Sequence, residues 1–534
     1  MREGQTHMSI FSVTFIGFMA ILVGLYFLLP SKYQWVILLA ASMVFYLAGG
    51  WHGIFYILVT IISQYLLALT LEHKNDEMAA ELALDSLDFK QKKQIKLKYA
   101  SKKKRYILLS VLINLGILCI FKFSNLAIES LNRFLGTQVG SLGLLAPLGL
   151  SYYTFKSIGY VIDVHRGRIK AQRNIFKLAL YISYFPTLIQ GPIDRYEDLA
   201  DQLYAEHTFD YQRLAFGVQR MLWGYIKKLV IAERIAVIVY ATTGAYAENG
   251  YVGFTVFLGM TIFAFQLYAD FSGGMDIVMG LSEIFGIFPT ENFRRPFFAT
   301  SYGEFWQRWH ITLGAWMRTY VFYPLSLSPA FNRLGKTCRK VFGDKYGKLI
   351  PPSLTTFITF FLIGMWHGAG WRYVLYSLYQ ALLVSTGTLL VDVYDKGKAL
   401  FRINEPSKIW HVFQMLRTFF LVTATRYLTL AKDLSDIKGL LKATFTCFNP
   451  WVFFDGSLYT LGLDRQNFTL MLLSIVGLLI VDYIQEKGIH IRQTIAEQNI
   501  VIRWCVYYAA IIILVVFGMY GPGFDAASFI YENF

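Results

Sequence analysis

Charged side chains are scarce in this sequence. Asp, Glu, Lys and Arg make up only 16% of its 534 residues, and 55% are hydrophobic, whereas about a quarter of the residues in a soluble globular protein are charged. Apolar runs long enough to cross about 30 Å of hydrocarbon recur along the chain. These runs are continuous and not alternating, which indicates helices and not a β-barrel. We therefore expect an all-α polytopic protein in a lipid bilayer.

Cysteine is also rare, and no two cysteines form a CxxC pair. The four residues lie far apart, mostly inside apolar runs: Cys119, Cys338, Cys447 and Cys505. This spacing indicates neither a disulfide framework nor a zinc site, and we expect no metal site. The sequence shows no convincing internal repeat, low-complexity linker or glycine-rich phosphate motif. We expect a single membrane domain over 1–534, with a motif-bearing core at about 141–392.

Apolar runs predict the membrane-spanning helices. The first run is too long for the core of a signal peptide and has no small-residue cleavage site after it, so we expect a retained helix. Because several runs are short, we expect roughly ten to twelve full crossings, with re-entrant and interfacial helices in addition. The candidate spans are 9–29, 35–48, 53–71, 107–123, 141–162, 175–190, 214–241, 252–269, 274–288, 354–367, 371–392, 410–430, 469–484 and 503–519.

The net charge of +15 is concentrated in a few places. Residues 90–105, KQKKQIKLKYASKKKR, carry nine Lys and Arg. This segment could bind an acyl carrier or a nucleic acid, but a cytoplasmic loop that follows the positive-inside rule is the preferred interpretation, and we expect no nucleic-acid partner. The basic stretches 72–106 and 163–174 are separated by two predicted spans. Both can therefore face the cytoplasm, which would place the N-terminus outside.

Two histidines lie at or near apolar runs. The first, His310, lies in EFWQRWHITLGAWMRTY, residues 304–320. On a helix with about 100° per residue, Trp306 and His310 fall on one aromatic face, with Trp309 beside it and Arg308 on the opposite side. We expect a single amphipathic helix here. A packed core histidine satisfied by one backbone carbonyl is the structural alternative.

The second histidine, His367, lies in GMWHGAGW, at the end of its own apolar run. Gly368 and Gly370 predict that the helix ends there and that a ligand or another backbone comes close. Glycines at a helix end beside an interfacial Trp366 are the structural alternative. Ionisable groups at membrane depth indicate function, and two imidazoles without nearby thiolate or carboxylate ligands suit proton transfer better than metal binding.

A third polar cluster interrupts the apolar stretch FQLYADFSGGMDIVMG, residues 265–280. Gln266, Asp270 and Ser272 are candidate substrate-binding residues, and Asp270 could instead orient a histidine or carry an ion. Gly273-Gly274 predicts a break, after which Asp276 could cap the next helix. A broken helix with carboxylates is also typical of an ion-coupled transporter, which stays an alternative function.

Several motifs together resemble those of the membrane-bound O-acyltransferase (MBOAT) family. The resemblance is closest to its bacterial alginate and peptidoglycan O-acetyltransferases and to the related teichoic acid D-alanyl transfer protein. The motifs are SIFSVTF, YFLLP and LLAASMVFY near the start, PLGLSYYTFKSIGYVIDVHRG, FPTLIQGPIDRYEDL, QLYADFSGGMDIVMGL, ENFRRPFFATSYGEFWQRWHITLGAWMRTYVFYPL, GMWHGAGW and the ending FIYENF. The resemblance implies a bowl of tilted helices with a central tunnel between a cytoplasmic acyl donor and an extracytoplasmic acceptor.

The resemblance also implies site residues. His367 matches the catalytic histidine of the family's WHG motif and is expected to be the general base, whereas His310 matches the second histidine and would position or polarise the thioester or relay the proton. Trp306, Trp309 and Trp366 would exclude water, and Arg308 could meet donor phosphates. Thr319 stands where related enzymes commonly carry aspartate, so no acidic role is assigned to it.

The implied reaction is O-acyl transfer. The expected donor substrate is acetyl-CoA or an acyl-carrier thioester, with no bound cofactor. The expected acceptor is an extracytoplasmic polysaccharide, peptidoglycan or a secreted SGNH-type transferase, at the plasma membrane of a bacterium. GPIDRY resembles the D-alanyl branch, so D-alanyl transfer from a carrier protein to teichoic acid stays open as the second enzymatic function.

Overall fold

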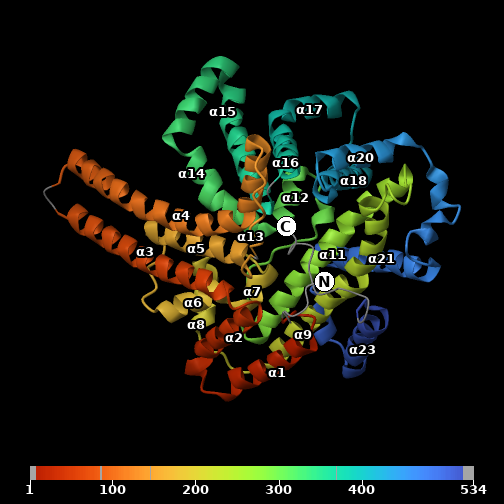
Figure 1. Ribbon diagram of the computed structural model, residues 1–534, viewed down its shortest axis with the longest axis horizontal. Helices are drawn as coiled ribbons and strands as arrows, with labels where there is room; N and C mark the ends of the chain where they lie inside the picture. The colour runs from red at the N-terminus through yellow and green to blue at the C-terminus, as the bar shows by residue number, and fades with distance from the viewer. Residues whose placement is uncertain (1–7, 85–86, 145, 369, 521–534) are drawn as a thin grey trace. The chain divides into compact units, whose positions relative to one another are not determined.

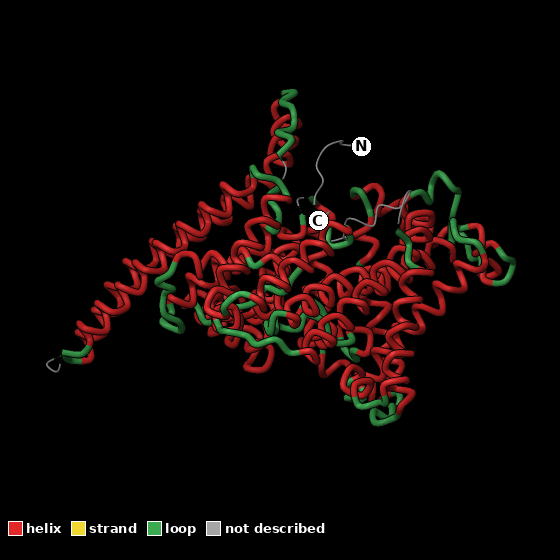
Figure 2. The backbone as a smooth tube through the Cα atoms, turned by 90° about the horizontal axis from the view of Figure 1, so that it is seen from below, coloured by secondary structure: helices red, strands yellow, loops and turns green. Residues whose placement is uncertain are grey.

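The computed structural model describes residues 8–84, 87–144, 146–368 and 370–520. Within these residues the chain is helical, without a strand, and a single isolated bridge joins Phe293 to Trp309. Figure 2 shows the helices and the loops that join them. The expected all-α class is confirmed. The family-like ending FIYENF and Ala369 lie outside the described residues.

Two compact units make up the chain, and the first contains residues 1–218 and 278–290. Its long helices α3 and α4 pack as an antiparallel pair against α5 (Figure 1). The helices of this unit are α1 (Val13–Leu28), η1 (Ser31–Tyr33), α2 (Gln34–Ala48), α3 (Gly53–Leu82), α4 (Phe89–Leu135), α5 (Leu150–His165), α6 (Ile175–Ser183), α7 (Phe185–Gln190) and α8 (Tyr196–Tyr204). Helices α9 (Tyr211–Tyr225) and α11 (Phe254–Ile284) continue from one unit into the other.

The second unit contains residues 219–277 and 291–534. Helix α15 packs along α16, and α12 packs against both α13 and α16. The helices are η2 (Ile226–Ala232), α10 (Glu233–Val239), η3 (Tyr240–Gly244), η4 (Pro296–Phe298), α12 (Tyr302–Arg308), α13 (Ile311–Met317), η5 (Arg318–Phe322), α14 (Tyr323–Ser326), α15 (Pro329–His367), α16 (Trp371–Leu389), α17 (Val391–Leu400), α18 (Lys408–Ala424), α19 (Arg426–Leu430), α20 (Leu434–Thr446), η6 (Pro450–Phe453), η7 (Ser457–Thr460), α21 (Arg465–Glu486), α22 (Ile491–Ala496) and α23 (Ile500–Phe517).

Seven helices in the described part of the chain are long and apolar enough to cross a membrane. The bent pair α16 and α17, with 65° between its members, raises this number to eight. The expectation of ten to twelve crossings was higher because several apolar runs, such as 175–190, fold as short helices. The candidate spans are Ser31–Ala48, Gly53–Leu82, Phe89–Leu135, Phe254–Ile284, Pro329–His367, Arg465–Glu486 and Ile500–Phe517.

The basic stretch 72–106 is helical over 72–82 and 89–106, where it forms the end of α3 and the start of α4. Helix α3 ends at Leu82 and α4 begins at Phe89, where Asp88 and Gln91 form a capping box. The second basic stretch, 163–174, contacts the same end of α3, since Arg173 pairs with Glu72 at 2.6 Å. The two basic stretches therefore lie beside each other in the first unit.

The core of the second unit surrounds α11. Side chains of this helix are buried on all sides, including Phe263, Leu267 and Phe271. A helix that is apolar all round is stable only when other helices cover it. By contrast, no residue of the apolar window of α23 is buried. Helix α11 is therefore the central element against which the site residues of this unit are placed.

Candidate active site

His310 lies in a break between two short helices. Helix α12 ends at Arg308 and α13 begins at Ile311, and His310 has a left-handed backbone with φ 47°. The expected continuous helix over 304–320 is therefore wrong. The backbone bonds explain the break, because Arg294 N donates to Arg308 O at 2.9 Å and Ile311 N donates to Asn292 O at 3.0 Å. Pairing with residues 292–294 replaces the helical bonds.

Asn292 sets the protonation pattern of His310. Its side-chain oxygen accepts a hydrogen bond from the backbone N–H of Thr312 at 3.0 Å and lies 3.2 Å from His310 Nδ1. A backbone N–H can only donate, so this Asn292 atom is the amide oxygen, an acceptor. His310 Nδ1 must then carry the proton. In the neutral ring Nε2 presents a lone pair, which can accept a proton or a hydrogen bond.

The surroundings of His310 favour its neutral form. The residue is 2% exposed, and the edge of the Phe271 ring lies against it at 5.0 Å between ring centroids. His310 lies outside the apolar spans, and burial lowers its pKa to about 3. Removal from water penalises the imidazolium form. The site therefore holds a neutral imidazole.

His367 is the last residue of α15, as the glycines after it predict. A methyl group at Gly364 would come within 1.7 Å of Ser377 Oγ, and one at Gly368 within 2.2 Å of the Tyr373 ring. The two glycines therefore let α16 approach the end of α15 closely, which is the close backbone approach expected from the sequence. This packing buries His367 to 8% exposure.

The Trp366 ring is close to the rings of both histidines. Its ring centroid is 6.2 Å from that of His310 and 4.8 Å from that of His367. Tyr376 of α16 lies on His367 at 5.9 Å, edge to face. The structure thus brings His310 into contact with Trp366, the neighbour of His367, from a separate part of the sequence.

A small cavity of about 20 Å³ adjoins His367. This volume suffices for about one water molecule. Its lining contains two phenols, one hydroxyl and one guanidinium. The lining residues are Phe263, Leu267, His367, Tyr373, Tyr376, Arg426 and Thr429.

The carboxylates of α11 form ion pairs. The helix continues through Gly273-Gly274, so the predicted break is wrong. A methyl group at Gly273 would come within 2.9 Å of Gly224 O, so the glycine lets α9 pack closely. Asp276 lies inside the helix and pairs with Arg220 at 3.0 Å, so it does not cap a helix.

Asp270 and Ser272 face the lysines of the π-helical turn η2. Lys228 Nζ lies 2.6 Å from Asp270 and 2.5 Å from Glu233. Lys227 Nζ donates to Ser272 Oγ at 2.9 Å. Gln266 is also buried, and its Oε1 has no hydrogen-bond partner among the residues described. Neither Asp270 nor Ser272 lines the cavity at His367.

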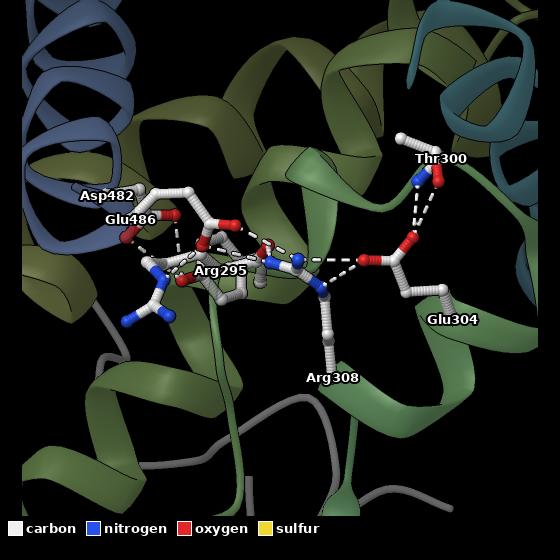
Figure 3. A network of polar contacts seen from close by, with 7 residues as sticks. Arg295, Thr300, Glu304, Arg308, Asp482 and Glu486 are labelled. Atoms are coloured by element: carbon white, nitrogen blue, oxygen red, sulfur yellow. Dashed lines mark hydrogen bonds and ion pairs between the residues drawn. The ribbon is translucent and has the colours of Figure 1, made fainter. Parts of the chain in front are cut away.

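Arg308 belongs to an ion-pair network with Glu304 and Glu486. Its guanidinium donates to both oxygens of Glu486 at 3.0 Å and to Glu304 at 3.0 Å. Arg295 Nε also lies 2.6 Å from Glu486, and Thr300 donates to Glu304 (Figure 3). Burial raises the pKa of Glu304, but bonds from Thr300 and Arg308 outweigh it and leave the pKa lowered. We therefore assign Arg308 to this network and not to donor phosphates.

The remaining tryptophans pack beside the site. Trp309 is stacked on Phe305 at 5.6 Å and paired with Phe293 by the backbone bridge. Trp306 Nε1 donates to Gln380 Oε1 of α16 at 3.2 Å. Both therefore form part of the packing between α12 and its neighbours.

The sequence analysis missed two polar residues of the site, Asn292 and Arg426. Asn292 lies in a polar stretch, 289–304, where nothing in the spacing predicts its bond to a residue 18 positions away. Arg426 had a signal, because it interrupts the apolar run 410–430, and an arginine at that depth indicates function by default.

Comparison with known proteins identifies the family of the chain. The family model described as "MBOAT, membrane-bound O-acyltransferase family" matches residues 168–337. A probable alginate O-acetylase, AlgI, from Azotobacter vinelandii is 30% identical over 448 residues, 82% of this chain and 78% of the relative. The peptidoglycan O-acetyltransferase of Helicobacter pylori is 27% identical over 367 residues, 64% of each chain.

A teichoic acid D-alanyltransferase is also related. The protein from Bacillus subtilis is 30% identical over 269 residues, 50% of this chain and 64% of the relative. The acetylase similarity therefore covers more of this chain than the D-alanyl similarity. Together with the apolar helices, these relatives identify a multi-pass membrane O-acyltransferase. The chain belongs to the membrane-bound O-acyltransferase family.

Proposed function

We propose that this protein transfers an acetyl group from a cytoplasmic thioester, acetyl-CoA, to a hydroxyl group of a cell-surface polysaccharide or peptidoglycan outside the cell. The observation that carries the proposal is the His310–Trp366–His367 cluster, in which the buried rings of a neutral imidazole and of a second histidine both contact Trp366. The named acetylases among the relatives support the acetyl group. A secreted SGNH-type transferase is the alternative acceptor.

His367 acts as the general base in this proposal. It removes the proton of the acceptor hydroxyl while the hydroxyl oxygen adds to the thioester carbonyl carbon. Collapse of the tetrahedral intermediate breaks the carbon–sulfur bond, and the thiolate takes the proton from the imidazolium. A positioned base of this kind contributes about 10²–10⁴-fold.

His310 accepts a proton or a hydrogen bond through Nε2, because its Nδ1 proton is directed at Asn292. Among the roles considered for His310, this tautomer favours proton relay and disfavours polarisation of the thioester carbonyl. Trp306, Trp309 and Trp366 keep water from the thioester. No bound cofactor is required by this chemistry.

The sidedness of the proposal follows from charge. The basic stretches 72–106 and 163–174 lie beside each other in the first unit and would face the cytoplasm of a bacterial cell. The donor would then enter from that side. The transporter alternative loses its main support, because α11 is continuous where that interpretation requires a break.

Transfer from radiolabelled acetyl-CoA tests the proposal. Purified protein in detergent is incubated with the donor and a polysaccharide acceptor, and thiol release and acetylated product are measured for wild type, His367→Ala and His310→Ala. His411→Ala, an exposed histidine of α18, is the control. We expect activity in wild type and His411→Ala and loss of at least about 10²-fold in His367→Ala.

Equal thiol release by wild type and His367→Ala would refute His367 as the base. The same assay with D-alanine as a carrier-protein thioester decides the donor. Turnover of that thioester, and not of acetyl-CoA, would refute the acetyl assignment and favour the D-alanyl function.

A further inference from the structure

Arg426 places a buried cation at the cavity that His367 lines. It begins the short helix α19, and only 6% of its surface is exposed. Its guanidinium carbon lies 5.8 Å from the ring centroid of Phe263 and 5.9 Å from that of Trp309. A guanidinium stays protonated at physiological pH. Removal of a permanent charge from water is costly.

The acyl-transfer reaction needs positive charge at this place. Attack on a thioester carbonyl moves the π electrons onto the carbonyl oxygen, and enzymes lower this barrier with fixed donors directed at the developing oxyanion. His310 does not supply such a donor, because its single ring proton is directed at Asn292. Of the residues described around the cavity, Arg426 alone carries a permanent positive charge.

We propose that Arg426 is a catalytic residue that stabilises the oxyanion of the tetrahedral intermediate. The inference rests on the function proposed above. The acceptor oxygen bonds to the carbonyl carbon as His367 takes its proton, and the carbonyl oxygen becomes negatively charged beside the guanidinium. When the carbonyl re-forms, the carbon–sulfur bond breaks and the thiolate leaves with the proton from His367.

The alternative role for Arg426 is to bind the carboxylate of an acidic sugar in the acceptor. The two uses differ in the acceptors that they affect, because an oxyanion forms with every acceptor whereas only some acceptors carry a carboxylate. Aromatic faces on Phe263 and Trp309 hold the guanidinium at one place. A restricted, desolvated cation is suited to charge that appears only in the transition state.

Kinetics of Arg426 variants test the proposal on the full-length protein in detergent. Arg426→Gln, Arg426→Lys and Arg426→Ala are compared with Arg402→Gln, which changes an exposed arginine of the same unit. Thiol release from acetyl-CoA is measured with a carboxylate-bearing polysaccharide, with a neutral polysaccharide and with water alone as acceptor. We expect Arg426→Gln to lower kcat by about 10²–10³-fold with all three acceptors and to leave the KM for the thioester within a few-fold.

A folding defect is separated from a catalytic one by chemical rescue. Added methylguanidine should restore part of the activity of Arg426→Ala and none of that of His367→Ala, and Arg426→Lys should retain more activity than Arg426→Gln. A rise in KM confined to the carboxylate-bearing acceptor, with unchanged hydrolysis, would overturn the proposal in favour of substrate binding. Unchanged kcat in Arg426→Gln, or no rescue of Arg426→Ala, would also overturn it.

If the proposed acyl-transfer function itself is wrong, the assay gives a different result. It appears as equal thiol release by wild type and His367→Ala, before any Arg426 variant is compared. If His367→Ala is inactive and Arg426→Gln is fully active, the proposed function stands and only the role of Arg426 is lost.

Discussion

Asn292 Oδ1 lies 3.2 Å from His310 Nδ1 and accepts a second hydrogen bond from the backbone N–H of Thr312. One amide oxygen therefore fixes both the ring tautomer of His310 and the start of α13. The same asparagine also bonds the hydroxyl of Thr312 at 2.9 Å. We infer that Asn292 positions His310 for its part in acyl transfer.

Asn292→Ala should lower kcat by about 10-fold or more, because the ring loses the bond that selects its tautomer, and positioned bases contribute about 10²–10⁴-fold. It should also destabilise the protein by about 1–3 kcal/mol, since buried donors lose their acceptor.

Asn449→Ala is the matched control, because the Asn449 side chain accepts a hydrogen bond from Phe254 N at the N-terminus of α11 and lies away from the histidines. Both variants should unfold at lower temperature, but only Asn292→Ala should lose kcat beyond its loss of folded protein. Equal kcat in the two would contradict the positioning role.

Acid should destabilise the wild-type protein partly through His310. Burial lowers the pKa of His310 to about 3, below the value of about 6.5 for an unfolded histidine. Between these values the unfolded state binds a proton that the folded state does not, so stability falls as pH falls below about 6.5. At pH 5 this difference corresponds to about 2 kcal/mol.

His310→Asn is the variant that checks this pH dependence, since Asn tolerates the left-handed backbone at this position. Its unfolding temperature should fall less steeply between pH 7 and pH 5 than that of wild type. Identical slopes for the two proteins would show that His310 does not titrate differently in the folded and unfolded states. His411→Ala, an exposed change in the same unit, should keep the wild-type slope.

Gly364→Ala should separate α15 from α16. The added methyl group would lie 1.7 Å from Ser377 Oγ and 2.6 Å from Tyr373 O, and backbone cannot yield as a flexible side chain does. We expect destabilisation of about 1–3 kcal/mol and a loss of activity, because His367 is placed by this contact. Gly387→Ala on α16 meets no atom within 4 Å and should be neutral or stabilising by up to about 1 kcal/mol. Chemical denaturation of both variants measures the difference.

The Arg308–Glu486 pair should couple α12 to the end of α21. Both oxygens of Glu486 accept hydrogen bonds from Arg308, in a site where the side chains are only 21% and 27% exposed. A double-mutant cycle with Arg308→Ala and Glu486→Ala should give a coupling energy of about 1 kcal/mol, at the upper end for partly exposed pairs. The exposed pair Lys348–Asp344 should show no measurable coupling. Equal coupling energies for the two pairs would mean that the ion-pair network in Figure 3 does not join α12 to α21.

Much of the helical class could be predicted from local composition. Apolar length alone identified spans such as 53–71 and 469–484, because a helix in lipid must satisfy its own backbone bonds. The end of α15 at His367 was also predicted, from the glycines that follow it in the sequence. These features depend on a residue and its near neighbours along the chain, so they can be predicted from the sequence alone.

Other predictions failed where distant residues decide the backbone. The pattern around His310 has good helical periodicity, yet the chain breaks there because residues 292–294 take the backbone bonds. Conversely, Gly273-Gly274 has the composition of a break, yet α11 continues because α9 packs against it at Gly224. The same type of residue ends one helix and lets another pack tightly.

By itself the sequence determined that this protein is an all-α membrane protein and which family its motifs resemble, and it singled out two histidines at or near apolar runs. Only the tertiary structure decided which groups meet: Asn292 with His310, Trp366 with both histidines, Arg426 with the cavity of His367, and Arg308 with Glu486. The physical reason is that hydrophobicity and helix termination are local properties of the chain. The orientation of a histidine and the place of a buried cation depend instead on partners that are brought together only by packing.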